Sequence, residues 1–176
     1  MKGRFALWPE RETKSAYGIP YERLYEEGIR GVIFDIDNTL VLPDAPADQA
    51  CRELFRRLGD MGLRTCVVSN NRGPRVETFA ADVGTGFVSR ALKPRKYGYR
   101  KAMELMGTTP ETTVSVGDQL FTDIWGANRM GMHSILTKPI SFRDEPQIML
   151  KRLFEVPVLI LYHRKKRKNN NFILPE

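Results

Sequence analysis

The chain has 176 residues, of which 41% are hydrophobic and 28% are charged, and its formal net charge is +7. This length suits one folded domain with short extensions, and the composition excludes a disordered or membrane-embedded chain. No apolar run reaches the roughly 20 residues of a spanning helix, and the charged N-terminal segment does not resemble a secretory signal. We therefore expect a cytoplasmic protein whose cysteines, Cys51 and Cys66, are reduced residues of the interior.

Apolar, β-rich runs alternate with helical patterns along the chain, which is typical of strand-helix-strand units and a parallel sheet. This order predicts a three-layer α/β/α sandwich around a Rossmann-like sheet. The expected strands are 31–36, 64–70, 86–89, 112–118 and 133–137, and the expected helices are 46–61, 73–83, 95–107 and 121–131.

The two ends of the chain lie outside this alternation. The three expected parts are an N-terminal extension that packs on the core, 1–30, the α/β domain, 31–150, and an apolar segment with a basic tail, 151–176. The tail contains HRKKRK at 163–168, a run that suits an anionic membrane or RNA but is as typical of a solvated tail. Pro157 is expected to break a continuous amphipathic helix, which favours packing of 158–162 on the core over a membrane anchor.

Polar side chains follow the expected strands at the points where the strands end. Asp35 and Asp37 end the first strand, and side-chain alternation puts them on one side of the backbone. Ser69 and Asn70 end the second strand. Because the carboxyl ends of parallel strands share one rim of the sheet, where ligands bind, we expect these residues to meet there.

Three further polar residues are expected at the same rim. Asp118 ends the strand 112–118, Asp123 follows at the next helix, and Lys93 lies in the loop before the helix 95–107. Carboxylates are hard oxygen ligands, and Mg²⁺ commonly binds one or two of them together with substrate phosphate and water. The set therefore predicts a Mg²⁺ site for phosphoryl chemistry.

Each residue has a role to fill in that chemistry. Asp35 can attack phosphorus and form an aspartyl-phosphate, and Asp37 can act as the acid for the leaving alcohol and the base for water. Lys93 adds fixed positive charge, and the Ser69 hydroxyl, with nearby backbone N–H groups, can hold phosphate oxygens.

The same residues also have interpretations without catalysis. Asp35 and Asp37 can cap a turn, Asp123 can stabilise a helix N-terminus, Ser69 can be a turn hydroxyl and Lys93 a surface lysine. Their order along the chain, each after an expected strand or before an expected helix, favours the joint catalytic interpretation.

Four short motifs carry a family resemblance: DIDNT at 35–39, SNN at 69–71, LKP at 92–94 and GDQLFTD at 117–123. They resemble the motifs of the haloacid dehalogenase (HAD) superfamily of phosphohydrolases. Over about residues 17–140 the sequence is similar to the YqeG-type branch of subfamily IIIA, which is related to phosphatidylglycerophosphate phosphatases. The resemblance implies a HAD-like fold and a Mg²⁺-dependent phosphoric monoester hydrolase.

The resemblance also implies residue roles. Asp35 would be the nucleophile, and Asp37 would be the acid and base whose backbone carbonyl also meets the metal. An aspartate at position 37, rather than another residue type, implies phosphatase and not dehalogenase chemistry. The implied catalytic residues are Asp35, Asp37 and Lys93; the phosphate-binding residues are Thr39, Ser69, Asn70 and Lys93; the metal ligands are Asp35, Asp37, Asp118 and Asp123.

The spacing of the motifs indicates what kind of substrate fits. Only 29 residues separate Thr39 from Ser69 and 23 separate Ser69 from Lys93, which leaves no room for a large cap domain. In this superfamily a capless enzyme implies a large or surface-bound substrate. The family resemblance makes phosphatidylglycerophosphate the leading substrate hypothesis. The alternatives are a phosphatase for a protein, nucleotide or sugar phosphate, and an RNA- or ribosome-binding protein with a residual phosphatase site. Peripheral contact with an anionic membrane is a further expectation, ahead of contact with nucleic acid.

Overall fold

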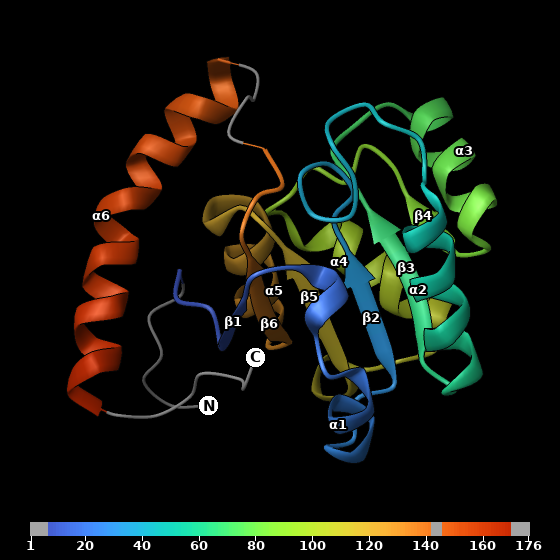
Figure 1. Ribbon diagram of the computed structural model, residues 1–176, viewed down its shortest axis with the longest axis horizontal. Coiled ribbons are helices and arrows are strands. Elements are labelled where there is room, and N and C mark those ends of the chain that lie inside the picture. Colours follow the sequence, from blue (N-terminus) through green and yellow to red (C-terminus); the bar gives the residue numbers. More distant parts are fainter. Residues whose placement is uncertain (1–6, 142–145, 170–176) are drawn as a thin grey trace.

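The structure is a computed structural model that describes residues 7–141 and 146–169 (Figure 1). Its described strands form one parallel sheet in the order β1-β6-β5-β2-β3-β4. The strands are β1 Arg11–Thr13, β2 Gly31–Phe34, β3 Arg64–Val68, β4 Gly86–Val88, β5 Thr113–Gly117 and β6 His133–Thr137. The five strands predicted from the sequence are therefore present, with ends that differ by up to two residues.

Helices cover both faces of this sheet. They are α1 Tyr21–Glu26, α2 Gln49–Asp60, α3 Gly73–Val83, α4 Lys96–Met106, α5 Trp125–Met130 and α6 Pro146–Asn169, with a π-helical turn at Leu120–Ile124 and 3₁₀ turns at Ala16–Gly18 and Pro110–Thr112. Between β2 and β5, where every residue is described, the connections contain α2, α3, α4, the strands β3 and β4 and the short 3₁₀ turn Pro110–Thr112. The predicted three-layer sandwich without a large cap domain is confirmed.

The central strand β2 shows why the strand residues are almost continuously apolar. Val32 and Phe34 belong to the cluster that packs against α1, α2 and α3, whereas Ile33 belongs to the cluster under α4 and α5. Successive side chains of a strand point to opposite faces, so both faces must be apolar when helices cover both. Phe34 also packs on Phe55 of α2, with ring centroids 5.3 Å apart.

Helix ends follow local chemistry where the sequence provides it. The Asp48 carboxylate accepts a hydrogen bond from the backbone N–H of Cys51 at 2.7 Å, so α2 begins at Gln49 and not at the expected residue 46. The helix α3 has the predicted bounds and ends at Gly84, which adopts the left-handed conformation that glycine accepts without a Cβ penalty. Both cysteines are buried and free, as expected.

The longest helix, α6, corrects one prediction. The expectation that Pro157 would break the helix is wrong, because α6 continues through it. Proline removes one hydrogen bond and crowds the carbonyl four residues earlier. Both Pro157 and Leu153 are exposed, so water can reach the carbonyl group that loses its partner. None of the helices in the described residues is long and apolar enough to cross a bilayer.

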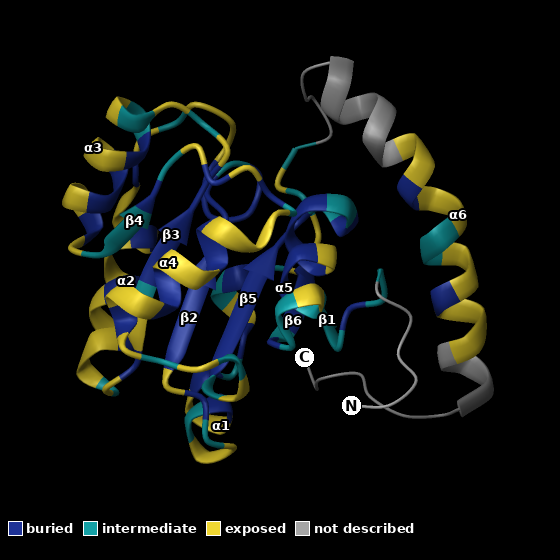
Figure 2. Ribbon diagram, turned by 180° about the vertical axis from the view of Figure 1, so that it is seen from behind, coloured by how far each residue is buried: buried dark blue, intermediate teal, exposed yellow. Residues whose placement is uncertain are grey.

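The two sides of α6 differ in what they contact. Val158 and Leu159 pack against a small cluster formed by the π-helical turn and β6, and the ring of Tyr162 lies 6.0 Å from that of Trp8. The predicted packing of 158–162 therefore holds for these residues. It does not hold for Ile160 and Leu161, which lie on the exposed side (Figure 2).

The edge strand β1 is attached to β6 by backbone pairing, and Glu10, the residue before β1, adds a polar side-chain contact to β6. The Glu10 carboxylate lies 2.9 Å from Nδ1 of His133. This hydrogen bond raises the pKa of His133 against the opposing effect of burial. A pKa raised by folding contributes stability that is complete below the unfolded value of about 6.5 and is lost as the pH rises through the folded value.

Replacement of His133 should therefore have a pH-dependent effect on stability. We expect His133→Gln to lower the free energy of unfolding at about pH 5.5 and to change it little at about pH 9. Urea unfolding of both proteins at the two pH values measures this difference. An equal loss at both values would show that His133 contributes by packing and not by its charge.

Candidate active site

The site begins where the chain leaves the centre of the sheet. Asp35 directly follows β2, and its N–H donates to the carbonyl of Val116 at 3.0 Å, which extends the pairing of β2 with β5. The chain then turns sharply, and Asn38 adopts a left-handed backbone conformation with φ of 62°. A non-glycine residue in this conformation is uncommon and often marks a functional turn. The Asp35 side chain is thereby fixed at the rim while the next residues fold back.

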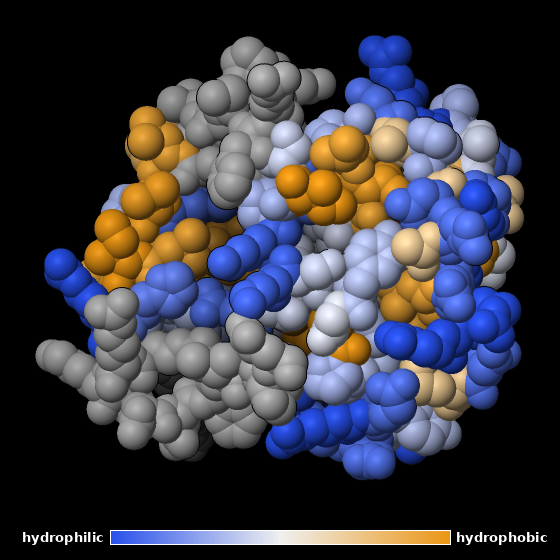
Figure 3. All heavy atoms as spheres, viewed as in Figure 1, coloured by the Kyte–Doolittle hydropathy of each residue, from blue (hydrophilic) through white to orange (hydrophobic). Residues whose placement is uncertain are grey.

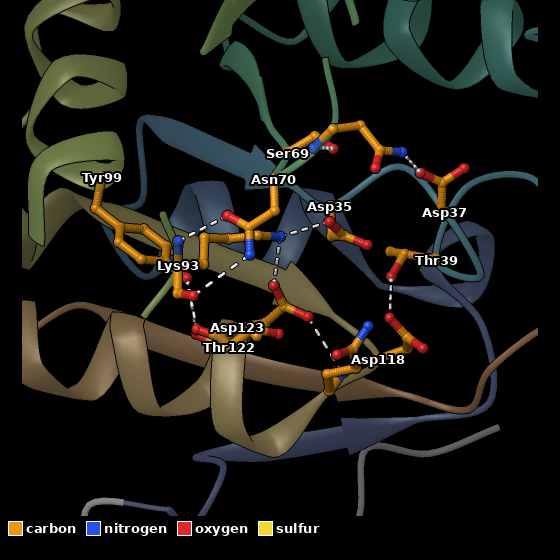
Figure 4. Close-up of polar contacts among 12 residues, drawn as sticks. Asp35, Asp37, Thr39, Ser69, Asn70, Lys93, Tyr99, Asp118, Thr122 and Asp123 are labelled. Carbon is orange, nitrogen blue, oxygen red and sulfur yellow. Dashed lines mark hydrogen bonds and ion pairs between the residues drawn. The ribbon is translucent and has the colours of Figure 1, made fainter. Parts of the chain in front are cut away.

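Lys93 lies between two buried carboxylates (Figure 4). Its Nζ is 2.5 Å from Oδ1 of Asp35 and 2.7 Å from Oδ1 of Asp123, and the three side chains are at most 10% exposed. Burial opposes the charge of Lys93, but Asp123 and Asp35 outweigh it and raise the pKa of the amine. Burial raises the pKa of Asp35, and the carboxylates of Asp123 and Asp118 raise it further against the effect of Lys93.

The site holds three carboxylates and one amine, and Lys93 contacts two of the carboxylates. One oxygen each of Asp35, Asp118 and Asp123 lies within 4.8 Å of the others, in a fully buried group. A buried excess of negative charge is costly unless a cation balances it. Carboxylate oxygens at this spacing fit a divalent metal ion, so the residues present suit the metal that the sequence predicts.

Asp123 reaches Lys93 through a local irregularity of the chain. The N–H groups of Asp123 and Ile124 both donate to the carbonyl of Gln119, and the second bond is the wide π-helical one. The other Asp123 oxygen accepts from the N–H of Gln119 at 3.1 Å. The Tyr99 hydroxyl donates to the carbonyl of Thr122 at 2.9 Å. The turn is therefore held from two sides.

Gly117, the last residue of β5, leaves room for the Asp123 side chain. A Cβ at this position would lie well inside contact distance of the Asp123 Cβ and carboxylate. We expect Gly117→Ala to displace Asp123 and to lower kcat by about 100-fold, the scale of a misplacement of 1 Å. The matched control is Gly59→Ala in α2, where an added Cβ meets nothing within 4 Å. Steady-state kinetics of both variants tests this, and unchanged turnover of Gly117→Ala would contradict it.

Two of the predicted phosphate-binding residues hold other site residues in place. The Thr39 hydroxyl donates to Oδ1 of Asp118 at 3.2 Å. The Asn70 side chain accepts from the backbone N–H of Lys93 at 2.7 Å and donates to its carbonyl at 3.3 Å. Ser69 lies buried at the end of β3, where its hydroxyl accepts from the N–H of Asn71. Their contacts with phosphate stay predictions.

Asp37 lies apart from the three clustered carboxylates. Its side chain forms an ion pair with Arg75, accepts from Nδ2 of Asn71 at 2.6 Å and accepts from the N–H of Asp44 at 3.0 Å. Figure 4 shows it on the far side of the site from Lys93. The predicted metal contact of Asp37 is through its backbone carbonyl, and this contact and its proton-transfer role stay predictions.

Sequence reasoning missed the residues that hold the predicted ones. Arg75 and Asn71 hold Asp37, and Tyr99 supports the turn that carries Asp123. Arg75 lies in the first turn of α3, directly after the strand-end residues Ser69 and Asn70. The first turn of a helix that follows such a strand faces the same rim of the sheet. This position in the sequence could have identified Arg75 as a site residue.

Comparisons with known proteins agree with this geometry. A family model described as HAD-hydrolase-like matches residues 91–145. The probable phosphatase YqeG of Bacillus subtilis (strain 168) is 35% identical over 158 residues, which cover 89% of this chain and 92% of YqeG. Phosphatidylglycerophosphate phosphatase 1, chloroplastic/mitochondrial, of Arabidopsis thaliana is 29% identical over 96% of this chain, which spans 51% of that protein.

A solved structure supports the fold. The HAD phosphatase of Thermococcus onnurineus superposes with a TM-score of 0.52 at 17% identity, over 67% of this chain and 90% of that one. Identity this low supports the fold alone, whereas the match to YqeG extends over nearly the whole of both proteins. The chain therefore belongs to the HAD-like phosphatases, in the branch that includes YqeG, and is a phosphoric monoester hydrolase.

Proposed function

We propose that this protein is a Mg²⁺-dependent phosphomonoester hydrolase that works through an aspartyl-phosphate and acts on phosphatidylglycerophosphate or a similarly large phosphorylated substrate. The observation that carries the proposal is the buried group at the rim, in which Lys93 contacts Asp35 and Asp123 while Asp118 completes the acidic cluster. A structural ion pair would need one carboxylate for one lysine, so the excess of carboxylates favours a metal-assisted site.

The residues divide the chemistry between them. An oxygen of Asp35 attacks phosphorus, and the bond to the leaving alcohol breaks. Asp37 donates a proton to that alcohol and later removes one from the water that hydrolyses the aspartyl-phosphate. Lys93 stabilises the charge on the phosphoryl oxygens, and the Ser69 hydroxyl donates to one of them.

Asp35, Asp118 and Asp123 would hold Mg²⁺, with the backbone carbonyl of Asp37. The bound ion supplies positive charge that offsets the repulsion between the attacking carboxylate and the phosphate. Thr39 orients Asp118 and Asn70 orients Lys93, which holds the carboxylate and the amine in position relative to Asp35.

The substrate follows from the open rim and from one relative. No cap domain interrupts the described connections between β2 and β5, so a substrate much larger than its phosphate can reach Asp35. The Arabidopsis relative is named for phosphatidylglycerophosphate and aligns over 96% of this chain, which favours that substrate. A protein, nucleotide or sugar phosphate is the alternative.

The exposed side of α6 favours a membrane surface as partner. Leu153, Phe154, Val156, Ile160 and Leu161 are each between 47% and 66% exposed. Figure 3 shows hydrophobic atoms gathered along this helix. The exposed basic residues Arg164 and Lys165 continue the helix. Apolar insertion combined with basic attraction is how peripheral helices bind anionic leaflets, and it would hold a cytoplasmic protein at the membrane.

The variant Phe154→Ser/Leu161→Ser tests this surface. We expect it to reduce binding to vesicles that contain an anionic phospholipid by about tenfold or more, because each side chain loses its apolar burial. Hydrolysis of p-nitrophenyl phosphate and the unfolding midpoint should not change. Vesicle sedimentation measures the binding. Equal binding by wild type and variant removes the membrane contact, and binding of RNA in its place, lost at higher salt, would support the nucleic-acid alternative.

The function itself is tested by phosphate release. Phosphatidylglycerophosphate in mixed micelles is compared with a panel of soluble phosphomonoesters, each with Mg²⁺ or with EDTA. Selective, Mg²⁺-dependent turnover of the lipid supports the full proposal. Turnover of soluble compounds alone keeps the hydrolase and removes the lipid. An absence of turnover from every substrate contradicts the proposed function.

A further inference from the structure

An open groove lies beside Lys93 at the rim of the sheet. Its lining residues are Asn70, Arg90, Leu92, Lys93, Pro94 and Arg95. Two of these, Asn70 and the buried Lys93, also belong to the candidate active site, whereas the other four extend away from it along the loop between β4 and α4. The groove therefore starts at the catalytic group and leads outward.

This loop is held in a fixed conformation. The N–H of Arg90 donates to the carbonyl of Asn71 and that of Ala91 to the carbonyl of Ser69, both at 3.0 Å. The side chain of Asn70 makes two hydrogen bonds to the backbone of Lys93. Arg90 and Leu92 both adopt left-handed backbone conformations, with φ of 47° and 55°.

The fixed loop turns its side chains alternately inward and outward. Ala91 and Lys93 are buried, while Arg90, Leu92 and Arg95 are exposed. Two guanidinium groups and one leucine are thus presented to the groove by a rigid segment, which is what a binding subsite requires.

The charges of the groove are unbalanced. Its lining contains no carboxylate. Lys93 is already neutralised by Asp35 and Asp123, but neither Arg90 nor Arg95 has a side-chain partner within the described part of the chain. Arginine binds phosphate and carboxylate groups through two parallel hydrogen bonds, so the two free guanidinium groups suit an anion.

We propose that this groove is a subsite for a second acidic group of the substrate, a phosphodiester or carboxylate, which Arg90 and Arg95 bind while the phosphomonoester lies over Asp35. Leu92 contacts the apolar atoms that link the two groups. This inference rests on the proposed function, because it assumes that Asp35 is the reacting residue. It makes the enzyme selective for phosphomonoesters that carry another negative charge a few bonds away.

Two soluble substrates separate the subsite from the chemistry. Glycerophosphoglycerol phosphate carries a phosphodiester beside its phosphomonoester, and glycerol 3-phosphate carries the monoester alone. We expect Arg90→Ala and Arg95→Ala each to lower kcat/KM for the first compound by about tenfold, mostly through KM, and to leave the second unchanged. The matched control is Arg100→Ala, whose exposed side chain on α4 is outside the lining of the groove. Arg90→Lys should recover only part of the loss, because lysine lacks the forked geometry.

Each result decides the proposal. A selective loss on glycerophosphoglycerol phosphate supports it, and phosphatidylglycerophosphate in micelles should then show a similar loss. A loss confined to micelles overturns it, since the arginines would then contact the lipid surface, and so does an equal loss on both soluble compounds. If no compound releases phosphate, the proposed function fails separately. Calorimetric binding of glycerophosphoglycerol then tests the subsite, and equal affinity in wild type and Arg90→Ala/Arg95→Ala overturns it.

Discussion

Asp35→Asn is expected to lower phosphate release by roughly 10⁴-fold or more, because an amide cannot form the phosphoenzyme and the remaining site residues supply only binding and charge stabilisation. The fold should survive the change. Asp35 is one of the two buried carboxylates that contact Lys93, and its removal leaves that amine paired with Asp123. Release of inorganic phosphate and thermal unfolding, measured on the same preparations, separate loss of chemistry from loss of structure.

One control variant and one further site variant accompany this experiment. Asp60→Asn removes an exposed carboxylate that pairs with Arg56 on α2 and should leave turnover unchanged. Asp37→Asn should lower turnover by about 10²- to 10⁴-fold, the usual contribution of acid–base catalysis, while binding of the metal is retained. Substantial turnover by Asp35→Asn would place the nucleophile elsewhere and remove the assignment of the site.

Lys93→Met should have the largest effect on stability. It removes the ammonium group from between Asp35 and Asp123, both of which remain buried. Removing one partner of a buried ion pair leaves an uncompensated charge and costs about 3–5 kcal/mol of unfolding free energy. Because a divalent ion that binds only the folded protein stabilises it, Mg²⁺ should recover part of this loss.

Chemical denaturation with EDTA and with Mg²⁺ measures both parts of the prediction. Lys96→Met is the matched control, because Lys96 lies exposed in the first turn of α4. It should leave stability and activity unchanged. If Lys93→Met is as stable as the wild type in EDTA, the carboxylates are protonated or hydrated in the folded protein and Lys93 does not balance them.

The sheet could be predicted because its strands are marked by their own residues. A strand buried on both faces has to be apolar throughout, as β2 is, and glycine or proline punctuates the helices between the strands. The rim could be predicted for the same reason, because parallel strands bring residues such as Ser69 and Asp118 to one edge whatever the details of the loops.

The elements that were missed lack such marks. The strand β1 consists of Arg11, Glu12 and Thr13, and only its pairing with β6 makes it a strand. The helix α1 has six residues, too few to show a helical period. In α6 the local rule for Pro157 was sound but was outweighed by packing against the π-helical turn and β6.

Within the site, residue types were easier to predict than partners. The parallel order of the strands places Asp35 and Lys93 at the same rim of the sheet, and the contact between their side chains is consistent with this placement. That Asp37 pairs with Arg75, 38 positions later, depends on the direction of a helix that the sequence does not specify. The missed contacts are all of this kind, because they depend on how separate elements are oriented relative to each other.

The π-helical turn Leu120–Ile124 contains one residue more than an α-helical turn would, so it is equivalent to a helix with a single insertion. Deleting one residue between Asp118 and Asp123 would restore the narrower hydrogen bonding and rotate Asp123 by about 100° about the helix axis, away from Lys93. Substitution alone cannot make that adjustment, because it changes side chains and not the count of residues in the turn. Deletion of a single codon is therefore enough to move the Asp123 carboxylate away from the rim of the sheet, even though the helix would still cover the sheet.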